Sequence, residues 1–578
     1  MKIHHAMFGL ILAPLVASAG EITLEIRHLM NGNPVSFADG RYMTAAGEEI
    51  SITRLSYLVS QPALQREDGT WIEQSHWISF VDATKGDPRL KLTKLPRERF
   101  LALRFTFGVD PERNHSDPAQ YPADHPLNPV LNNLHWDWQQ GYIFVALEGH
   151  AEDEDTSSGF SYHIGNDPNL MTVTSGSAVD LTRNNVRLEI DFHLDKVLAD
   201  GGFSILEATS THSRPGDLVA TSLKERIESA VNISGIYSVD PEAATQADRS
   251  RNSTPPLIGT PYELKIGRNF PVPTLPSDFP LTNERVELGE TLFHDGILSV
   301  NGVVSCASCH LENHAFADER ANSWGIDMTP TRRNSMPLFN LAWKSHFFWD
   351  GRSPSLREQV LEPIEHPGEM ADTLENVVQK LSTDGDYPGM FEAAYGSRVI
   401  DAEKIAVSLE QYLLTLTSHD SKFDQALRGE TELSAQEKRG FELFVTEYDP
   451  RRGLKGADCF HCHGGPLFTD HQLHNNGLAR SDDLGLGEVT GRKTDYYKFS
   501  TPSLRNIAIT APYMHDSRFG TLEEVIDHYD SGIDHSPTLD PNIAKHPRAG
   551  LGLTAADKAA LVAFLKALTD PQFLPPPH

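Results

Sequence analysis

Two short motifs, Cys306-Ala307-Ser308-Cys309-His310 and Cys459-Phe460-His461-Cys462-His463, organise this sequence. Each has the spacing Cys-x-x-Cys-His, in which two thiols add across the vinyl groups of a c-type haem and the histidine binds its iron. The motifs contain all 4 cysteines of the chain, so none is left to form a structural disulfide. A structural zinc site would normally take four ligands from paired knuckles. The sequence therefore predicts two covalently bound haems, with His310 and His463 as iron ligands.

The start of the chain has the features of an export signal. Lys2 precedes an apolar run from Ala6 to Val16, and Ala17-Ser18-Ala19 supplies the small residues of a signal peptidase site. No later apolar stretch approaches the ~20 residues of a membrane span. We predict that residues 1–19 are a signal peptide and that the mature protein is soluble and periplasmic, a compartment that suits covalent haem attachment.

The chain of 578 residues is strongly acidic, with a formal net charge of −30. Nucleic acid is therefore excluded as a partner, because no basic patch is present to release counterions. The charge favours solubility and, secondarily, the steering of a basic redox partner. The length predicts two or three domains.

The first part of the chain has the period-two pattern of β-strands. Apolar or inward-facing residues alternate in three runs: Ile22, Leu24, Ile26 and His28; Leu101, Leu103, Phe105 and Phe107; and Val186, Leu188, Ile190 and Phe192. This pattern predicts an antiparallel β-sandwich over residues 20–239. Residues 240–281 are rich in Pro, Ser, Asn and Thr and are predicted to be a linker.

Beyond the linker the pattern becomes helical. Ser434-Ala435-Gln436-Glu437 and Thr521-Leu522-Glu523-Glu524 are capping boxes, and apolar residues recur at helical spacing from Ile405 to Leu416. We predict two mainly α-helical, class I cytochrome c-like domains, over residues 282–428 and 429–578.

Four further motifs give the second half a family resemblance. They are Leu292-Phe293-His294-Asp295, Phe348-Trp349-Asp350-Gly351-Arg352, Thr501-Pro502-Ser503-Leu504-Arg505-Asn506 and Ala511-Pro512-Tyr513-Met514-His515-Asp516. Through them, residues 281–569 resemble the bacterial dihaem cytochrome c peroxidase and MauG superfamily. The resemblance implies an oxidoreductase that acts on hydrogen peroxide.

The same resemblance implies unequal roles for the two haems. A loop histidine closes the first haem in the plain peroxidases, but Ile326 stands at that position here, which implies an iron open to peroxide. A methionine ligates their second haem, whereas Tyr529 stands at its place, as in MauG-type enzymes. On its own, Tyr529 would be interpreted as a half-buried core residue. A phenolate stabilises high-valent iron, so the resemblance implies that two oxidising equivalents are stored over both haems, in a bis-Fe(IV)-type state.

Residues around the haems carry over in the same way. Gln359, Pro363 and Glu369 match the distal pocket of the first haem. Glu369 would shuttle the proton for O–O cleavage, Gln359 would hydrogen-bond peroxide, and Pro363 would keep the sixth site small.

Between the haems, Trp349 matches a tryptophan that relays electrons. Asn334, Thr510 and Pro512 match positions that hold a calcium ion with hard oxygen ligands.

The first half carries a second resemblance. Its motifs are Leu134-His135-Trp136-Asp137-Trp138-Gln139-Gln140-Gly141-Tyr142-Ile143-Phe144, Leu147-Glu148-Gly149 and Phe160-Ser161-Tyr162-His163-Ile164-Gly165. Over residues 21–237 they resemble MbnP-like copper proteins, in which the MauG-like enzyme MbnH converts a tryptophan to kynurenine. The resemblance implies that enzyme and protein substrate are fused here, which raises their effective concentration. It favours Trp136 or Trp138 as the modified residue over Trp71 and Trp77.

Kynurenine would offer an aniline nitrogen to copper, and two imidazoles beside it would complete a nitrogen-rich site. We predict His28 and His163 as these ligands. His28 shares an inward strand face with Ile22, Leu24 and Ile26, although a buried imidazole is more often a hydrogen-bonded core residue.

Three functions stay open from the sequence. The first is a self-modifying, peroxide-dependent tryptophan oxidase that matures its own copper site. The second is a cytochrome c peroxidase that takes electrons from a small periplasmic cytochrome. The third is a copper-binding carrier whose dihaem half only transfers electrons. Tyr529 and Ile326 favour the first.

Overall fold

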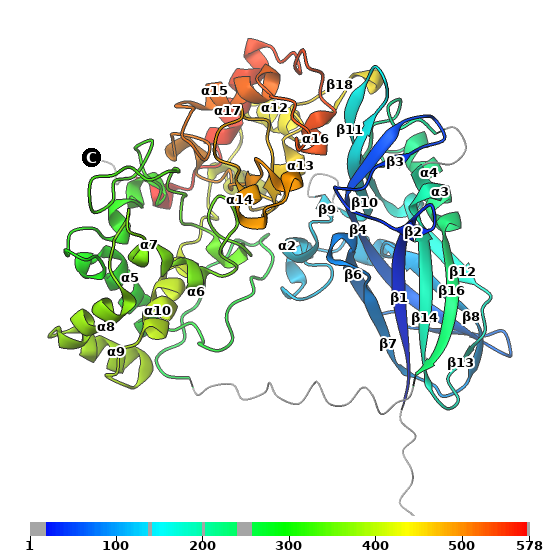
Figure 1. Cartoon of the computed structure of the whole chain (residues 1–578), viewed down its shortest axis with the longest axis horizontal. Coiled ribbons are helices and arrows are strands. Elements are labelled where there is room, and N and C mark those ends of the chain that lie inside the picture. Colours follow the sequence, from blue (N-terminus) through cyan, green and yellow to red (C-terminus); the bar gives the residue numbers. More distant parts are fainter. Residues whose placement is uncertain (1–18, 137–140, 199–202, 240–256, 575–578) are drawn as a thin grey trace, which may run out of the picture.

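The structure, a computed structural model, describes residues 19–136, 141–198, 203–239 and 257–574. A β-rich half is followed by a helical half, and the two lie side by side (Figure 1). The predicted signal peptide up to residue 18, and Trp138, lie outside the described residues. Within these ranges no helix is long and apolar enough to cross a membrane.

Two sheets form the β-rich half. The smaller has the order β16-β14-β1-β2, with β7 also paired to β1: β1 (Gly20–Met30), β2 (Asn33–Pro34), β7 (Arg89–Leu95), β14 (Asn185–His193) and β16 (Val231–Val239). The larger follows the path β12-β8-β4-β10-β11-β15: β4 (Glu49–Arg66), β8 (Arg99–Phe107), β10 (Gly141–Glu152), β11 (Ser157–Gly165), β12 (Met171–Ser175) and β15 (Ser210–Thr211). Short strands flank this path: β3 (Tyr42–Met43), β5 (Trp71–Glu73), β6 (Ile78–Asp82), β9 (His135–Trp136) and β13 (Val179–Asp180). Helices α1 (Pro111–Asn114), α2 (Pro129–Asn132), α3 (Leu194–Leu198) and α4 (Leu218–Ala230) complete this half.

The prediction of wholly antiparallel pairing is wrong at two pairs, the central pair β1–β14 and the short edge pair β11–β15. Strands β1 and β14 run parallel, from Ile22 opposite Val186 to Leu29 opposite His193. Parallel neighbours need a long crossover, and most of the β-rich half lies between these two strands in the chain.

The predicted inward faces are confirmed with one exception. Ile22, Leu24 and Ile26 are buried, and apolar side chains from both sheets form one continuous hydrophobic cluster. Leu101, by contrast, is 37% exposed. The pairing of β4 with β8 is irregular between Gln65 and Arg66, opposite this point, so the side-chain alternation is broken there.

The helical half contains two clusters of helices. The first comprises α5 (Asn283–His294), α6 (Leu356–Gln359), α7 (Glu362–Glu365), α8 (Leu374–Thr383), α9 (Tyr387–Tyr395) and α10 (Ala402–Thr415). The second comprises α11 (Lys422–Leu427), α12 (Ala435–Phe444), α13 (Phe460–His463), α14 (Leu486–Thr490), α15 (Leu522–Ser531), α16 (Pro541–Ala544) and α17 (Ala555–Lys566). We call the regions around these clusters the first and second haem units. The predicted capping boxes at Ser434 and Thr521 are present at the starts of α12 and α15.

A glycine allows the main helix pair of each unit to approach closely. A Cβ on Gly289 of α5 would lie 1.9 Å from the backbone oxygen of Ser408 in α10. A Cβ on Gly440 of α12 would lie 2.0 Å from the backbone oxygen of Ala560 in α17. A glycine therefore occupies the point of closest helix contact in both units, because any side chain there would clash with the facing backbone.

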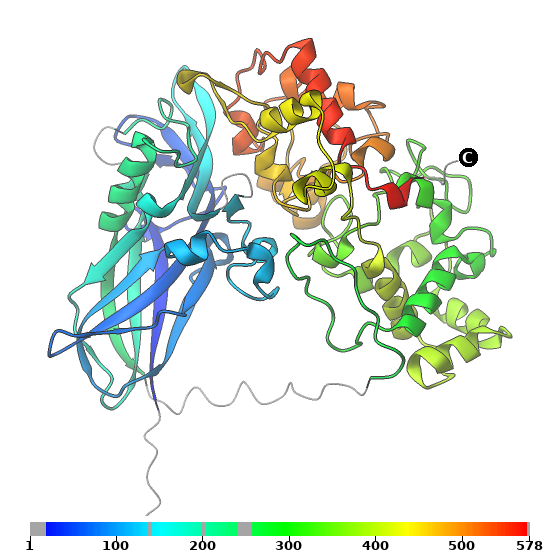
Figure 2. The same cartoon turned by 180° about the vertical axis from the view of Figure 1, so that it is seen from behind.

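The β-rich half packs against the second haem unit. Figure 2, like Figure 1, shows the yellow-to-red segments beside the cyan strands, with the green helices farther away. A Cβ on Gly159 of β11 would lie 2.0 Å from the backbone oxygen of Pro541 in α16. His150 of β10 also donates through Nε2 to the carbonyl of Leu539, at 2.8 Å. The two halves thus meet in direct backbone and side-chain contact.

Candidate haem and metal centres

The first haem motif lies in a tight turn that orients its histidine. Cys306 begins a 3-10 helix that ends at Ser308. The Nδ1 of His310 donates to the carbonyl of Phe316 at 2.8 Å, so Nε2 is oriented as the iron-binding nitrogen. This outer hydrogen bond is typical of a metal-bound imidazole. Cys306 and Cys309 are free thiols, so the residues present fit a covalently attached haem.

Two of the predicted distal residues lie together near this motif. The N–H of Met370 donates to the carbonyl of Pro363, and that of Ile326 donates to the carbonyl of Glu369 at 2.8 Å. Burial raises the pKa of Glu369. Burial also raises the pKa of Cys306 to about 12, with Glu369 as a smaller contributor, so this carboxyl lies near the motif. The loop position that holds histidine in plain peroxidases therefore packs against the Glu369 segment.

The third distal residue, Gln359, ends α6 and is half-buried. Its backbone N–H donates to the carbonyl of Ser355.

The second motif has the same histidine geometry. The Nδ1 of His463 donates to the carbonyl of Phe468 at 3.2 Å. Tyr529, on α15, accepts a hydrogen bond on its hydroxyl from Asn476 at 3.1 Å. Burial raises the pKa of Tyr529, and the thiols Cys462 and Cys459 add to this effect, so the phenol lies near the motif.

The predicted relay and calcium residues lie at the junction of the two haem units. The indole N–H of Trp349 donates to the carbonyl of Asn334 at 2.9 Å, and the Trp349 carbonyl accepts from Ser500. Asn334 is buried, and its Nδ2 atom has no hydrogen-bond partner in the structure. Thr510 is also buried, and the peptide bond before Pro512 is cis. The side-chain oxygens of Asn334 and Thr510 are of the hard type that calcium prefers.

The two predicted copper ligands, His28 and His163, do not meet in the structure. His28 Nε2 hydrogen-bonds to the hydroxyl of Tyr57 at 2.8 Å, inside the β-rich half. Tyr57 pairs with Val145, and Val145 pairs with Ile164, so these three share one face of the larger sheet. His163, the neighbour of Ile164, points to the opposite face. The prediction that His28 and His163 share a metal is therefore wrong, and His28 is a hydrogen-bonded core residue.

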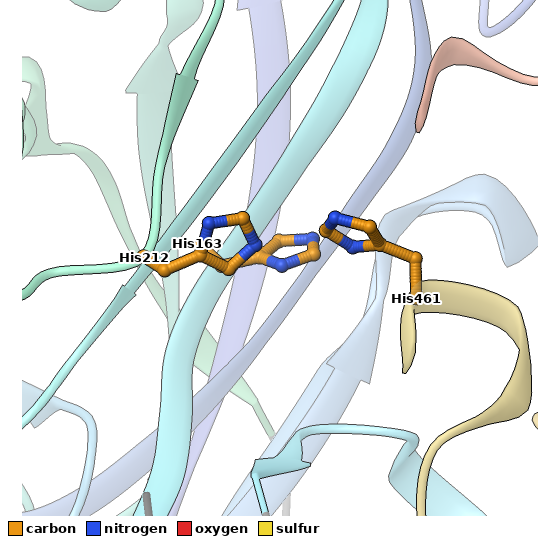
Figure 3. A group of neighbouring side chains, drawn as sticks. All are labelled: His163, His212 and His461. Atoms are coloured by element: carbon orange, nitrogen blue, oxygen red, sulfur yellow. The ribbon is translucent and has the colours of Figure 1, made fainter. Parts of the chain in front are cut away.

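His163 instead belongs to a cluster of three histidines. One ligand atom from each of His163, His212 and His461 lies within 4.8 Å of the others. Figure 3 shows the three rings turned toward one another, with His461 coming from α13 and the others from the β-rich half. The ring centroids are 5.1 Å apart for His163 and His212, 4.9 Å for His212 and His461, and 5.5 Å for His163 and His461.

Buried carboxylates hold these imidazoles. Oxygens of Glu148, Glu447 and Asp458 lie 2.8, 3.1 and 3.0 Å from nitrogens of His163, His212 and His461, respectively. Burial lowers the pKa of His163 to about 3 and that of His461 to about 4. Both rings are therefore neutral near pH 7, the state that binds metals.

Trp136 lies beside this cluster. Its ring centroid is 6.1 Å from that of His212, and a Cβ on Gly165 would lie 2.7 Å from the Trp136 ring. Trp136, His163 and His461 line one small cavity of about 70 Å³ between the two halves. Trp136, rather than His28, is thus the predicted copper-site residue that the structure brings to His163.

His212 and His461 were not predicted from the sequence. His212 follows the two-residue strand β15 and belongs to no periodic pattern. His461 occupies a position inside the second haem motif that haem attachment leaves free, and that was the only available signal.

Comparisons with known proteins cover both halves. Residues 283–432 match the di-haem cytochrome c peroxidase family, and residues 19–213 match the MbnP family. The methylamine utilization protein MauG of Methylorubrum extorquens is 38% identical over 300 residues, covering 51% of this chain and 80% of that protein. The cytochrome c551 peroxidase of Nitrosomonas europaea is 32% identical over 268 residues, covering 45% of this chain and 77% of that protein. The crystal structure of a MauG-like protein associated with microbial copper homeostasis has 34% identity and a TM-score of 0.48, covering 54% of this chain and 98% of that one.

Proposed function

The chain belongs to the di-haem cytochrome c peroxidase and MauG family of peroxide-dependent oxidoreductases, and from this premise we propose that it oxidises Trp136 of its own β-rich half to kynurenine. The product would complete a copper site with His163 and His212. We further propose that the protein is exported to the periplasm through the signal peptide at residues 1–19.

The observation that carries this proposal is the position of Trp136. The indole lines the same cavity as His461, which lies between the haem-binding residues Cys459 and Cys462. A haem bound at Cys459 and Cys462 would therefore lie a short distance from this ring and could oxidise it. Trp136 is only 3% exposed, which protects a reactive intermediate from water.

The two c-type haems, when bound, supply an iron that reacts with peroxide and a second iron that shares the oxidising equivalents. Around the first, Glu369 has a raised pKa and is suited to deliver a proton to a peroxide oxygen. Gln359 would orient the peroxide, and Pro363 would limit the space above the iron. At the second haem, Asn476 orients the hydroxyl of Tyr529, the proposed axial ligand.

The junction between the units supports the relay. The Asn334 carbonyl accepts from the indole N–H of Trp349 and restricts the movement of the ring, while Ser500 holds the Trp349 backbone. Because Asn334 belongs to the proposed calcium site with Thr510 and Pro512, a bound calcium ion would fix the partner of the Trp349 indole.

The reaction balances with peroxide as the only oxidant. Two molecules of hydrogen peroxide remove four electrons from the indole of Trp136, give it two oxygen atoms and release two molecules of water. Cleavage of the indole C2–C3 bond yields N-formylkynurenine. Hydrolysis then releases C2 as formate and leaves the aniline nitrogen of kynurenine beside His212, a ligand set that copper accepts.

Mass spectrometry of the haem-loaded protein, before and after peroxide, tests the proposal. We expect the peptide that contains Trp136 to have the mass calculated with kynurenine in place of tryptophan. The Trp136→Phe variant should show no such product. Trp77→Phe is the matched control, because the Trp77 indole donates to Lys91 on β7 and is remote from the cavity. Modification of Trp138 instead of Trp136, or full oxidation in Tyr529→Phe, would contradict the proposal.

A plain peroxidase activity is the second candidate, because relatives include a cytochrome c551 peroxidase. It predicts steady consumption of peroxide with a reduced small cytochrome as electron donor, at a rate that does not depend on Trp136.

A further inference from the structure

We propose that His461, from the second haem motif, is a third ligand of the copper ion, and that Cu(I) bound there supplies electrons to the second haem for peroxide reduction. The inference rests on the proposed copper site and adds an activity to it, the peroxide-dependent oxidation of Cu(I). It makes the metal site a joint product of both halves.

Geometry and burial support three ligands rather than two. His212 is 1% exposed, His163 is 4% exposed, and the side chain of His461 is 2% exposed. Their ligand atoms all lie within 4.8 Å of one another. Three imidazoles at this separation form a nitrogen-rich site of a kind that copper accepts.

Two buried nitrogen atoms point to a missing ion. The Nδ1 atoms of His163 and His461 have no hydrogen-bond partner in the structure. The Nε2 atom of His163 hydrogen-bonds to Glu148 at 2.8 Å, whereas the Nε2 atom of His461 lies 3.0 Å from Asp458 and 3.1 Å from Lys545 Nζ. Buried polar atoms are almost always paired. For His163, one nitrogen fixed by a carboxylate and the other unpaired is the pattern of a metal-binding histidine, and His461 contributes a second unpaired nitrogen beside it.

The local charge favours a monovalent cation. Three carboxylates, Glu148, Glu447 and Asp458, contact the histidine cluster. Two cations contact these carboxylates: Arg54 lies 2.8 Å from Glu148, and Lys545 lies 3.0 Å from Asp458. One buried negative charge therefore remains, and a cuprous ion on neutral imidazoles would balance it.

Chain connectivity gives the copper a direct route to the haem. His461 immediately precedes Cys462, which anchors the haem, and lies two residues before its iron ligand His463. The Phe460 ring stacks on His461 at 4.3 Å and contacts His212 at 5.5 Å. The same segment therefore binds the haem and approaches the metal, which is what electron transfer between them requires.

The proposed reaction is balanced. Each bound Cu(I) would give one electron to the second haem and become Cu(II) in the site, where it exchanges with Cu(I) when Cu(I) is in excess. Hydrogen peroxide at the first haem takes two electrons and two protons and becomes two molecules of water. Two cuprous ions are therefore oxidised in sequence for each peroxide.

The first test is copper binding to full-length, haem-loaded protein matured with peroxide. Anaerobic titration with Cu(I) against a chromogenic chelator should give one copper per chain. His461→Gln should weaken binding more than about tenfold, by analogy with lost metal-site partners. His150→Gln is the matched control, since His150 lies at the same interface but bonds to Leu539, and should bind copper normally. Unchanged affinity in His461→Gln would overturn the proposal.

The second test follows the copper electron. Peroxide added anaerobically to the Cu(I)-loaded protein should produce an EPR signal of Cu(II), with two Cu(II) formed for each peroxide when Cu(I) is in excess. His461→Gln should slow this oxidation more than tenfold relative to His150→Gln. Cu(I) that persists in the wild-type protein after peroxide is consumed would overturn the proposal.

Two further measurements separate the possible failures. Kynurenine should still form in His461→Gln, so its absence from all variants refutes the tryptophan reaction and not the role of His461. If His461→Gln loses its second haem, the number of histidine ligands is read instead from the Cu(II) EPR spectrum of the wild-type protein. Coupling to three histidine nitrogens supports the site, and coupling to only two refutes it.

Discussion

The two haem motifs have the same spacing but use their middle residues differently. In the first motif the hydroxyl of Ser308 accepts the N–H of Ser305 at 3.0 Å, which closes a local turn. In the second motif Phe460 and His461 contact His212, which belongs to the other half of the molecule. In both motifs the cysteines and the final histidine are assigned to the haem. The two middle residues are therefore free to form different contacts, local ones in the first motif and contacts between the halves in the second.

This difference extends to the contacts around each motif. Beside the second motif, the guanidinium of Arg505 is 1% exposed and forms two hydrogen bonds with Asp424. Its Nε donates to the carbonyl of Pro466, three residues after His463. In the first unit, Arg357 bonds to the buried Glu410 and also to the exposed Asp278. The second motif thus depends more on a fully buried ion pair.

The largest expected effect comes from breaking that pair. Arg505→Leu leaves the Asp424 carboxylate buried without its cation and should lower the free energy of unfolding by about 3–5 kcal/mol. Arg428→Leu is the control, because its bonds to Asp420 and Glu430 are exposed, and it should cost less than about 1 kcal/mol. Urea unfolding followed by haem absorbance measures both. Equal losses would show that the buried pair has no special role.

The next effect concerns the interface between the halves. Gly159→Ala would place a Cβ about 2.0 Å from the backbone of Pro541 and should weaken docking of the β-rich half by about 1–3 kcal/mol. Gly176→Ala is the control, since nothing lies within 4 Å of its added Cβ. Small-angle scattering should show an expanded molecule only for Gly159→Ala. A compact Gly159→Ala protein would mean that the interface can absorb the methyl group.

The pH dependence should differ in sign between the two units. Burial raises the pKa of Asp424, but Arg505 outweighs it and the net pKa is lowered. The stability that Asp424 contributes is therefore present above its unfolded pKa of about 4 and is lost as the pH falls through the lower folded value. Burial raises the pKa of Glu410 overall, so its contribution is lost as the pH rises from about 4 through the folded value.

Urea unfolding at a series of pH values checks these signs. Asp424→Asn should reduce the loss of stability on acidification, and Glu410→Gln should reduce the loss on raising the pH. The same sign for both variants would refute the distinction between the units.

The smallest effect is expected within the first motif. Ser308→Ala removes the two local hydrogen bonds between the Ser308 hydroxyl and Ser305 and should lower the free energy of unfolding by about 0.5–1 kcal/mol. Copper binding should stay unchanged, because Ser308 belongs to no metal cluster in the described ranges. A copper defect in Ser308→Ala would remove the contrast between the motifs.

Strong periodicity made much of the fold predictable. The alternation of Ile22, Leu24 and Ile26 marks a strand with one buried face, and the capping boxes mark the starts of α12 and α15. The exposure of Leu101 and the parallel pairing of β1 with β14 were not predictable. Both depend on how distant strands align, which a local pattern does not encode.

The metal site was harder to predict for a related reason. His28 was chosen because an inward strand face suggests a protected site, but that face is the apolar core. His163 lies on the other face, beside His212 of the same half and His461 of the second haem unit. Its burial depends on a haem unit much later in the chain, and so does the proximity of His461.

The route of the chain through the molecule has a consequence for its biogenesis. The β-rich half is synthesised first, yet it packs against the second haem unit, which is synthesised later, including Pro541 and Asn542. The three histidines can therefore converge only after translation has passed both haem motifs. A chain truncated between the two haem motifs could fold its strands and bind its first haem. It would lack His461 and the neighbouring Lys545. Copper loading would then distinguish chains that extend through the second haem unit from truncated ones.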